Sequence, residues 1–373
     1  MKLIVLRSNL LDALSYIEKG VGGDSSLPIL KNVLLKTEGN KIIMVGTNLE
    51  LAITSMFSGK IIENGETTIP FSVFFSIVKN LNAERISIEL KNKKIIITTD
   101  NYEASIQGQE AREFPIIPSL HNSAQAIKIN THAFIEALQK TVVAAQYSEI
   151  RPEISGMLFR AEDNFICVAT DGFRLTEKKI DQNQIETQSK EVVRVIIPLR
   201  TIEEMLRILP ALEKQEEFIE IFIDPTQILF KTQTVQAVSR LIDGNFPEYE
   251  PIIPKNTEME IVVSRRELIN ALKLTSSFSG RANDISFILG ENKKHIELYS
   301  GDASLGEGRY KVSARIKGDG ASSLTFNWRY FLDGLKVFDS EEVTIGINAP
   351  DKPVVIKTQE EPLLIYIVMP IKN

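Results

Sequence analysis

The chain of 373 residues has very little of the chemistry that builds disulfides or metal centres: one cysteine, Cys167, and three histidines, His121, His132 and His295. A single cysteine excludes an intramolecular disulfide and supplies too few thiolates for a cysteine-based zinc cluster. No two histidines stand at metal-ligand spacing. We therefore expect no disulfide framework and no metal, and a reducing compartment, the cytoplasm, is the natural location.

Long hydrophobic runs are also missing, since no segment approaches the roughly 18 apolar residues that cross a bilayer. The first residues are apolar for only a short stretch before Arg7 and lack a small-residue cleavage site, which argues against a signal peptide. The chain carries 43 Lys and Arg against 49 Asp and Glu, a net charge of −6. This mild acidity argues against non-specific coating of nucleic acid, but it does not say how charge is distributed.

Catalytic motifs are absent as well. There is no Gly-x-Ser-x-Gly, and the segment GDASLGEG (301–308) lacks the Gly-Lys-Ser/Thr ending of a phosphate loop and has the pattern of a hairpin. Asp171 and Gly172 in ATDGFRLT form either a catalytic carboxylate at a strand end or a hairpin turn. Without a second carboxylate, a suitably placed histidine or a metal cluster, we interpret them as a turn. We predict no catalytic residue, no cofactor and a binding or scaffolding protein.

What the sequence does contain is a threefold repeat. Three segments share an alternating strand followed by an amphipathic helix: KLIVLRSNLLDALSYI from Lys2, AIKINTHAFIEALQKT from Ala126 and EIVVSRRELINALKLT from Glu260. A second strand-helix pattern recurs from Thr67, Arg194 and Ser323, and a third pattern ends at Pro118, Pro254 and Pro370. The repeat is about a third of the chain, which is too long for a solenoid unit and long enough to fold as a domain.

These patterns predict an α+β fold of three similar domains, each with two helices on one face of antiparallel sheets and about eight strands. The predicted domains are 1–120, 121–255 and 256–373, with boundaries in the polar stretches 119–125 and 254–258. The predicted helices are 8–19, 71–81, 131–140, 200–209, 265–275 and 329–338. Three tandem domains have exposed ends, and a two-fold dimer that pairs sheet edges would close them into a six-domain ring.

The predicted helices are more basic than the rest of the chain. They carry ten Lys or Arg and seven Asp or Glu, so the remaining residues sum to a charge of −9. Basic helices inside an acidic shell are typical of a channel that holds a polyanion. The alternative, that so small a difference arises by chance on solvated helix faces, stays open.

Several motifs resemble the bacterial DNA polymerase III beta subunits, the sliding clamps. They are ATDGFRL, LIDGNFPEYEPIIP and YIVMP, and SLPILKNVLL, GTNLEL and RPEISGMLF match too, so the resemblance covers essentially the whole chain. It implies a homodimeric ring of six domains with helices lining a hole for duplex DNA. It also implies a non-catalytic tether for the DNA polymerase III alpha subunit and other clamp-motif proteins, loaded by an ATP-dependent clamp loader.

The resemblance further implies a hydrophobic groove for partner peptides between the second and third domains. Its residues would be Ile154, Thr170, Gly172, Phe173, Arg174, Leu175, Pro247, Ile252, Pro353, Ile367, Met369 and Ile371. Arg174 would be available to a polar group of the peptide. The outward polar positions of the predicted helices are the candidates for sequence-independent contacts with DNA phosphates: Lys79, Lys140, Arg200, Arg207, Arg266, Lys273, Arg329 and Lys336.

The chain departs from the family pattern at a few positions. Phe173 stands where the family usually has histidine, and Asp24 and Asn245 stand where it often has a basic residue. Glu250 and Pro251 replace a segment that is commonly basic. Phe173 should make the groove more apolar, and Asp24 removes a DNA contact. Two alternatives to a clamp follow: a relative that binds partners without encircling DNA, and a hydrolase that uses Asp171.

Overall fold

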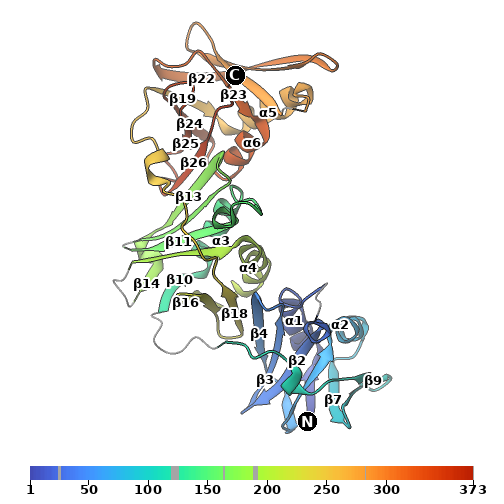
Figure 1. Ribbon diagram of the computed structural model, residues 1–373. Helices are drawn as coiled ribbons and strands as arrows, with labels where there is room; N and C mark the ends of the chain where they lie inside the picture. The colour runs from blue at the N-terminus through green and yellow to red at the C-terminus, as the bar shows by residue number, and fades with distance from the viewer. Residues whose placement is uncertain (24–26, 119–125, 163, 188–191, 282, 373) are drawn as a thin grey trace. The chain divides into compact units, whose positions relative to one another are not determined.

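The computed structural model describes residues 1–23, 27–118, 126–162, 164–187, 192–281 and 283–372 (Figure 1). Asp24 and the predicted linker 119–125, which includes His121, lie outside these residues. The described residues divide into two compact units. The first lies within Met1–Thr131, Glu186–Ser189 and Arg207–Leu241, and the second within His132–Ile185, Lys190–Leu206 and Ile242–Asn373. We describe each unit by itself.

Six α-helices occupy the predicted positions in the described ranges, which confirms the strand-helix repeats. They are α1 (Arg7–Ile17), α2 (Phe71–Asn80), α3 (Thr131–Val142), α4 (Leu199–Leu212), α5 (Arg265–Thr275) and α6 (Trp328–Lys336). The main difference is at α4, which continues through Pro210 beyond its predicted end. A proline in the last turn removes only one helical hydrogen bond, and its φ is compatible with a helix.

The first unit contains two antiparallel sheets. Their strands are β1 (Lys2–Leu6), β2 (Asn32–Glu38), β3 (Lys41–Thr47), β4 (Leu51–Phe57), β5 (Lys60–Glu63), β6 (Glu66–Pro70), β7 (Arg85–Lys91), β8 (Lys94–Thr98), β9 (Glu103–Gln107), β10 (Ala126–Asn130), β14 (Ile185–Thr187), β16 (Phe218–Ile223), β17 (Gln227–Lys231) and β18 (Val235–Arg240). One sheet has the order β5-β1-β7-β8-β9, and the other has the order β14-β10-β16-β17-β18-β4-β3-β2-β6.

The second unit contains one sheet of order β15-β11-β12-β13-β26-β25-β24-β19-β22-β21-β20-β23. Its strands are β11 (Gly156–Ala161), β12 (Phe165–Thr170), β13 (Arg174–Ile180), β15 (Val193–Pro198), β19 (Met259–Ser264), β20 (Asp284–Leu289), β21 (His295–Asp302), β22 (Gly306–Gly318), β23 (Ser323–Asn327), β24 (Glu342–Ile347), β25 (Val354–Lys357) and β26 (Leu364–Val368). The hairpin predicted at 301–308 is confirmed as the turn between β21 and β22.

The burial of side chains follows the repeat. Alternate residues of β1 (Leu3, Val5) and one face of α1 (Leu10, Leu14, Ile17) are almost fully buried. The same alternation and the same helical spacing recur from β19 into α5 in the third domain. Each such apolar side chain contributes about 1.5–3 kcal/mol when fully buried. The strand and helix of each repeat therefore supply a core of their own.

The sheets continue from one domain to the next. The first domain holds β1–β9, the second β10–β18 and the third β19–β26. The last strand of the second domain, β18, pairs antiparallel with β4 of the first, and the last strand of the third domain, β26, pairs antiparallel with β13 of the second. The borders predicted at 120/121 and 255/256 stay predictions.

Two of the sheet edges in the described part of the chain stand where the repeat would place a join between domains. The last strand of the first domain, β9, pairs only with β8. The first half of β22, residues 306–313, pairs only with β21, while its second half turns to β19. In the order of the repeat, these edges are the counterparts of β18 and β4.

Candidate functional site

The turn between β12 and β13 is built by its own side chains. The Thr170 hydroxyl donates to the carbonyl oxygen of Arg174 at 2.7 Å. Asp171 Oδ1 accepts the backbone N–H groups of Phe173 and Arg174 at 2.9 and 3.0 Å, and Gly172 has φ of +91°. Glycine adopts this conformation without a steric cost. The interpretation of Asp171 and Gly172 as a hairpin turn is confirmed, and the Asp171 carboxylate serves the turn.

Arg174 is held from both sides. Its Nε donates to Asp171 Oδ2 at 2.9 Å and its Nη1 donates to Asp333 Oδ2 at 2.7 Å. The guanidinium lies over the ring of Tyr330 at 4.5 Å, a favourable cation–π distance. Two of the five guanidinium N–H donors thus bind carboxylates of the same chain, and the expectation that Arg174 is available to a peptide stays a prediction.

Several of the other predicted groove residues lie at or beside this turn. Leu175 faces Ile367 across the β13–β26 pair, and the Met369 N–H donates to the carbonyl oxygen of Phe173 at 2.8 Å. Leu175 and Ile367 join a buried apolar cluster with Phe246, on the segment that follows β18. The buried members are Ile154, Thr170, Leu175 and Ile367, and the exposed or half-buried members are Gly172, Phe173, Arg174, Pro247, Ile252, Pro353, Met369 and Ile371. The predicted set thus combines a few buried residues around Leu175 with more exposed ones, and the groove itself stays a prediction.

Two residues of this region were missed by the sequence analysis, Tyr330 and Asp333 of α6. The rings of Phe173 and Tyr330 stack with centroids 6.4 Å apart, and Phe173 is 61% exposed. No motif in the sequence marks these two residues. They reach the turn because the pairing of β26 with β13 brings the third domain beside it.

Lys140 corrects the list of predicted DNA-facing residues. It is 8% exposed, and its ammonium forms ion pairs with Asp339 at 2.9 Å, with Glu136 at 3.2 Å and with Glu361. Burial by itself would lower the pKa of Lys140, but hydrogen bonds to Glu361 and Asp339 outweigh it and raise the pKa above its ordinary value. The expectation of an outward side chain is wrong because the end of α3 packs against the segment after α6 and the turn before β26.

The other predicted DNA-facing residues are exposed: Lys79, Arg200, Arg207, Arg266, Lys273, Arg329 and Lys336. Some of them contact their own chain. Arg329 donates to Asn283 at 3.1 Å and lies over the Trp328 ring, and Lys336 lies 3.9 Å from Asp333. Because their side chains reach solvent, these residues could contact DNA, and their role as DNA-facing residues stays a prediction.

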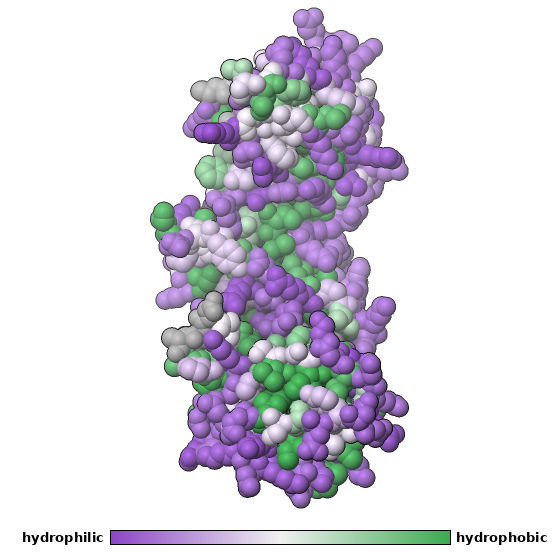
Figure 2. Space-filling view, turned by 90° about the vertical axis from the view of Figure 1, so that its right-hand side faces the viewer, coloured by the Kyte–Doolittle hydropathy of each residue, from purple (hydrophilic) through white to green (hydrophobic). Residues whose placement is uncertain are grey.

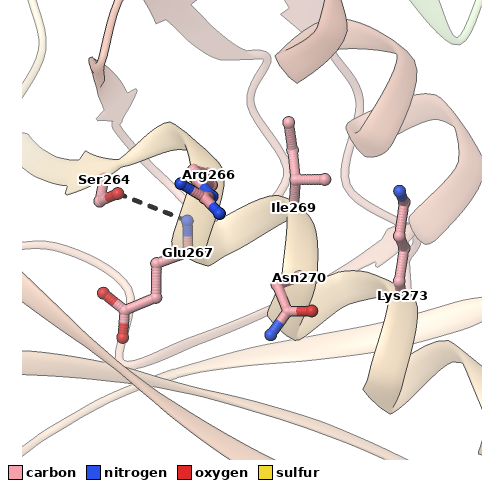
Figure 3. Close-up of a pocket in the computed structure, with 6 residues that line it drawn as sticks. All are labelled: Ser264, Arg266, Glu267, Ile269, Asn270 and Lys273. Atoms are coloured by element: carbon pink, nitrogen blue, oxygen red, sulfur yellow. Dashed lines mark hydrogen bonds between the residues drawn. The ribbon is translucent and has the colours of Figure 1, made fainter.

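Arg266 and Lys273 of α5 border a shallow pocket with Ile269 (Figure 3). They are seven residues apart, about two helical turns, and therefore share one side of the helix. The start of α5 is fixed by Ser264, whose Oγ accepts the Glu267 N–H at 3.4 Å. The pocket therefore has two basic side chains, Arg266 and Lys273, on a helix whose N-terminus is capped by Ser264.

The described residues contain no group of three His, Cys, Asp or Glu side chains placed to hold a metal ion. None of the helices in these ranges is long and apolar enough to cross a membrane. Cys167 is fully buried, and burial raises the pKa of its thiol. A buried thiol of raised pKa is a poor nucleophile.

Comparison with known proteins identifies the family. Models of the N-terminal, central and C-terminal domains of the DNA polymerase III beta subunit match residues 1–118, 128–248 and 250–372. The chain is 27% identical over 386 residues to the beta sliding clamp of Bacillus subtilis (strain 168), and the match covers both proteins completely. The beta sliding clamp of Staphylococcus aureus (strain Mu50) is 26% identical over 383 residues, again with full coverage of both.

Solved structures agree with this assignment. The crystal structure of the DNA polymerase sliding clamp from Bacillus subtilis has a TM-score of 0.93 at 26% identity, covering 100% of this chain and 99% of that one. The DNA polymerase III subunit beta from Pseudomonas aeruginosa has a TM-score of 0.93 at 25% identity, with full coverage of both chains. Three clamp domains with continuous antiparallel sheets define a non-catalytic DNA sliding clamp. The chain belongs to the DNA polymerase III beta subunit family.

Proposed function

We propose that two copies of this chain close head to tail into a six-domain ring around duplex DNA. The observation that carries the proposal is the pattern of strand pairing. The last strand of one domain pairs with the preceding domain at β18–β4 and at β26–β13. If the last strand of the first domain pairs in the same way with the third domain of a second copy, β9 of one copy pairs with residues 306–313 of the other. Two such seams pair these two edges in both copies and close the ring.

The helices support the same seam. Counted from the first helical residue, Leu274 of α5 takes the position of Lys140 in α3. Leu274 is 54% exposed, and the turn before β9 carries Tyr102, which is 39% exposed, whereas the turn before β26 carries Glu361. The ionic contact between the second and third domains would thus become an apolar contact between copies. Apolar residues dominate the cores of stable homodimer interfaces.

The first domain presents apolar surface for this contact. Figure 2 looks onto the side of the molecule where α2 and β9 lie in Figure 1, and it shows a hydrophobic patch there among hydrophilic side chains. On α2, Val73 is 48% exposed and Phe75 and Ile77 are half-buried. This is the helix that the repeat places opposite α5 of a second copy.

Inside the ring, the exposed basic side chains of the helices would meet DNA phosphates and leave the bases unread. Such contacts do not depend on sequence, so the ring could move along the duplex. The groove around Leu175 would hold apolar anchors of the DNA polymerase III alpha subunit, the clamp loader and other clamp-motif proteins. A cytoplasmic location follows from this role.

Retention on circular DNA tests the ring directly. The protein is loaded onto a nicked circle by an ATP-driven clamp loader, and the complex is isolated at high salt. We expect retention at high salt followed by release when the circle is cut, because a closed ring is linked topologically. Failure of retention, with a loader shown to load another clamp, would contradict encirclement and favour a relative that only binds partners.

The contribution of α5 to DNA binding is measured by salt dependence. Replacing Arg266 and Lys273 with alanine should reduce the slope of log affinity against log salt by about 2 per engaged copy, since each lost phosphate contact removes about 0.9. Anisotropy of a labelled short duplex gives the slope. Lys41 and Lys60 lie exposed on the strands β3 and β5 and provide the matched double alanine control. An unchanged slope in the α5 variant would place the DNA contacts elsewhere.

A further inference from the structure

A second pocket lies in the first unit, where β4 of the first domain pairs with β18 of the second. It is lined by Thr47, Leu49, Glu50, Ala52, Pro115, Ile116, Ile117, Pro118, Gln227, Val238 and Arg240. These residues come from the turn between β3 and β4, from the segment after Phe114, and from β17 and β18. None of them belongs to the proposed partner groove.

The turn in this pocket repeats the hydrogen bonds that the side chains of the β12–β13 turn form with the backbone. The Thr47 hydroxyl donates to the Leu51 carbonyl at 3.1 Å, as Thr170 does to Arg174. Asn48 Oδ1 accepts two backbone N–H groups, from Glu50 at 3.0 Å and from Leu51 at 2.8 Å, as Asp171 does. Leu49 has φ of +75°, in the place of Gly172 at +91°.

The neighbouring strand repeats as well. The Arg240 N–H donates to the Glu50 carbonyl at 3.0 Å, and the Met369 N–H donates to the Phe173 carbonyl at 2.8 Å. Ala52 faces Val238 across β4 and β18, as Leu175 faces Ile367 across β13 and β26. The pocket residues Thr47, Leu49, Glu50, Ala52, Val238 and Arg240 therefore stand at the positions of Thr170, Gly172, Phe173, Leu175, Ile367 and Met369. The pair Phe114-Pro115 likewise repeats Phe246-Pro247.

We propose that this pocket is a second peptide site, which takes a short extended peptide with a leucine or phenylalanine anchor between one acidic and one basic side chain. The form of the peptide rests on the proposed partner groove, whose geometry the pocket repeats. The anchor would lie against apolar side chains left in water: Leu49 is 44% exposed and Ile116 is 94% exposed.

The charges of the pocket determine the flanking residues of the peptide. Glu50 and Arg240 are exposed, and neither side chain has an ion-pair partner in the described part of the chain. They occupy the positions of the apolar Phe173 and Met369. A peptide carboxylate would pair with Arg240 and a peptide ammonium or guanidinium with Glu50. An uncharged apolar peptide would prefer the partner groove, so the two sites would sort partners by charge.

The test uses three fluorescein-labelled peptides: Lys-Gly-Leu-Phe-Gly-Glu, its charge-exchanged form Glu-Gly-Leu-Phe-Gly-Lys, and the neutral Ser-Gly-Leu-Phe-Gly-Ser. Binding is measured by anisotropy on full-length protein carrying Met369→Asp, which removes the partner groove from the readout. We expect one charged peptide to bind at least about tenfold more tightly than the neutral one. Arg240→Glu should abolish that preference, and Glu50→Lys with Arg240→Glu should transfer it to the other charged peptide.

Equal binding of the three peptides, or a preference that survives Arg240→Glu, would overturn the proposal. Binding without any response to Ile116→Ser would overturn it too, because the anchor would then lie elsewhere. The partner groove is tested separately, by binding of the neutral peptide to protein with Met369 intact. The ring is tested by retention on circular DNA. Arg240→Glu should leave both unchanged, so failure of the second site is distinguishable from failure of the proposed function.

Discussion

Leu274→Asp should convert the protein from a dimer into monomers of 41.9 kDa that are not retained on circular DNA. Leu274 is 54% exposed on α5 and lies at the position that Lys140 occupies between the second and third domains. In a two-fold ring the substitution affects both seams at once. A carboxylate buried there without a counter-charge would cost several kcal/mol per seam. Sedimentation equilibrium measures the mass, and loading on a nicked circle measures retention.

Val192→Asp provides the matched control for this experiment. Val192 is 66% exposed and precedes β15, a strand that the proposed seam does not include. This variant should remain a dimer and be retained, because it introduces the same charge at an exposed apolar residue outside the proposed seam. A dimeric Leu274→Asp protein that stays on the circle would show that the ring closes through other surfaces.

Lys140→Met should lower the free energy of unfolding of the second unit by about 2–3 kcal/mol, since removing one partner of a buried ion pair leaves the others uncompensated. The value is below that of a fully buried pair because Asp339 is 84% exposed, whereas Glu361 is 15% exposed. Urea unfolding followed by hydrogen exchange in α3 and β26 measures the loss. Lys36→Met removes an exposed pair with Glu38 and should change stability by less than about 0.5 kcal/mol.

The pH dependence of this difference has a defined sign. Burial opposes the charged form of Glu136, but its hydrogen bonds to Lys178 and Lys140 outweigh burial and lower the pKa of the carboxyl below 4.5. Its contribution is therefore complete above pH 4.5 and is lost as the pH falls through the lowered value. The raised pKa of Lys140 preserves its charge up to at least pH 10.5. The free energies of unfolding of the unsubstituted protein and of Lys140→Met should differ by a constant amount between pH 4.5 and pH 10.5, and the difference should shrink in acid. A difference that grows in acid would contradict the ion-pair cluster.

Much of the fold was accessible from the sequence because local periodicity encodes it. The alternation in β1 and the spacing of Leu10 and Leu14 in α1 predict a strand and a helix, and the structure buries those residues. The threefold recurrence of this pattern predicts three domains. The Asp171-Gly172 turn was also predictable, because its hydrogen bonds join residues within four positions of one another.

The candidate site was only partly accessible in this way. The motifs around Arg174 marked the turn, but not the engagement of its guanidinium by Asp333 and Tyr330 of α6. Lys140 shows the same limit, because the helical spacing predicted an exposed side chain and the structure buries it. Its partners Asp339 and Glu361 lie about 200 positions further along the chain, and no local pattern records that approach.

The sequence by itself therefore determined the elements, their threefold order and the turns, since each depends on residues close together in the chain. The tertiary structure decided which strands join the domains, which cations are buried and which strand lies beside each repeated turn. These outcomes depend on long-range strand pairing: β26 on β13 brings Met369 to one turn, and β18 on β4 brings Arg240 to the other. The same hairpin geometry thus acquires different chemistry from neighbours that only the folded chain brings together.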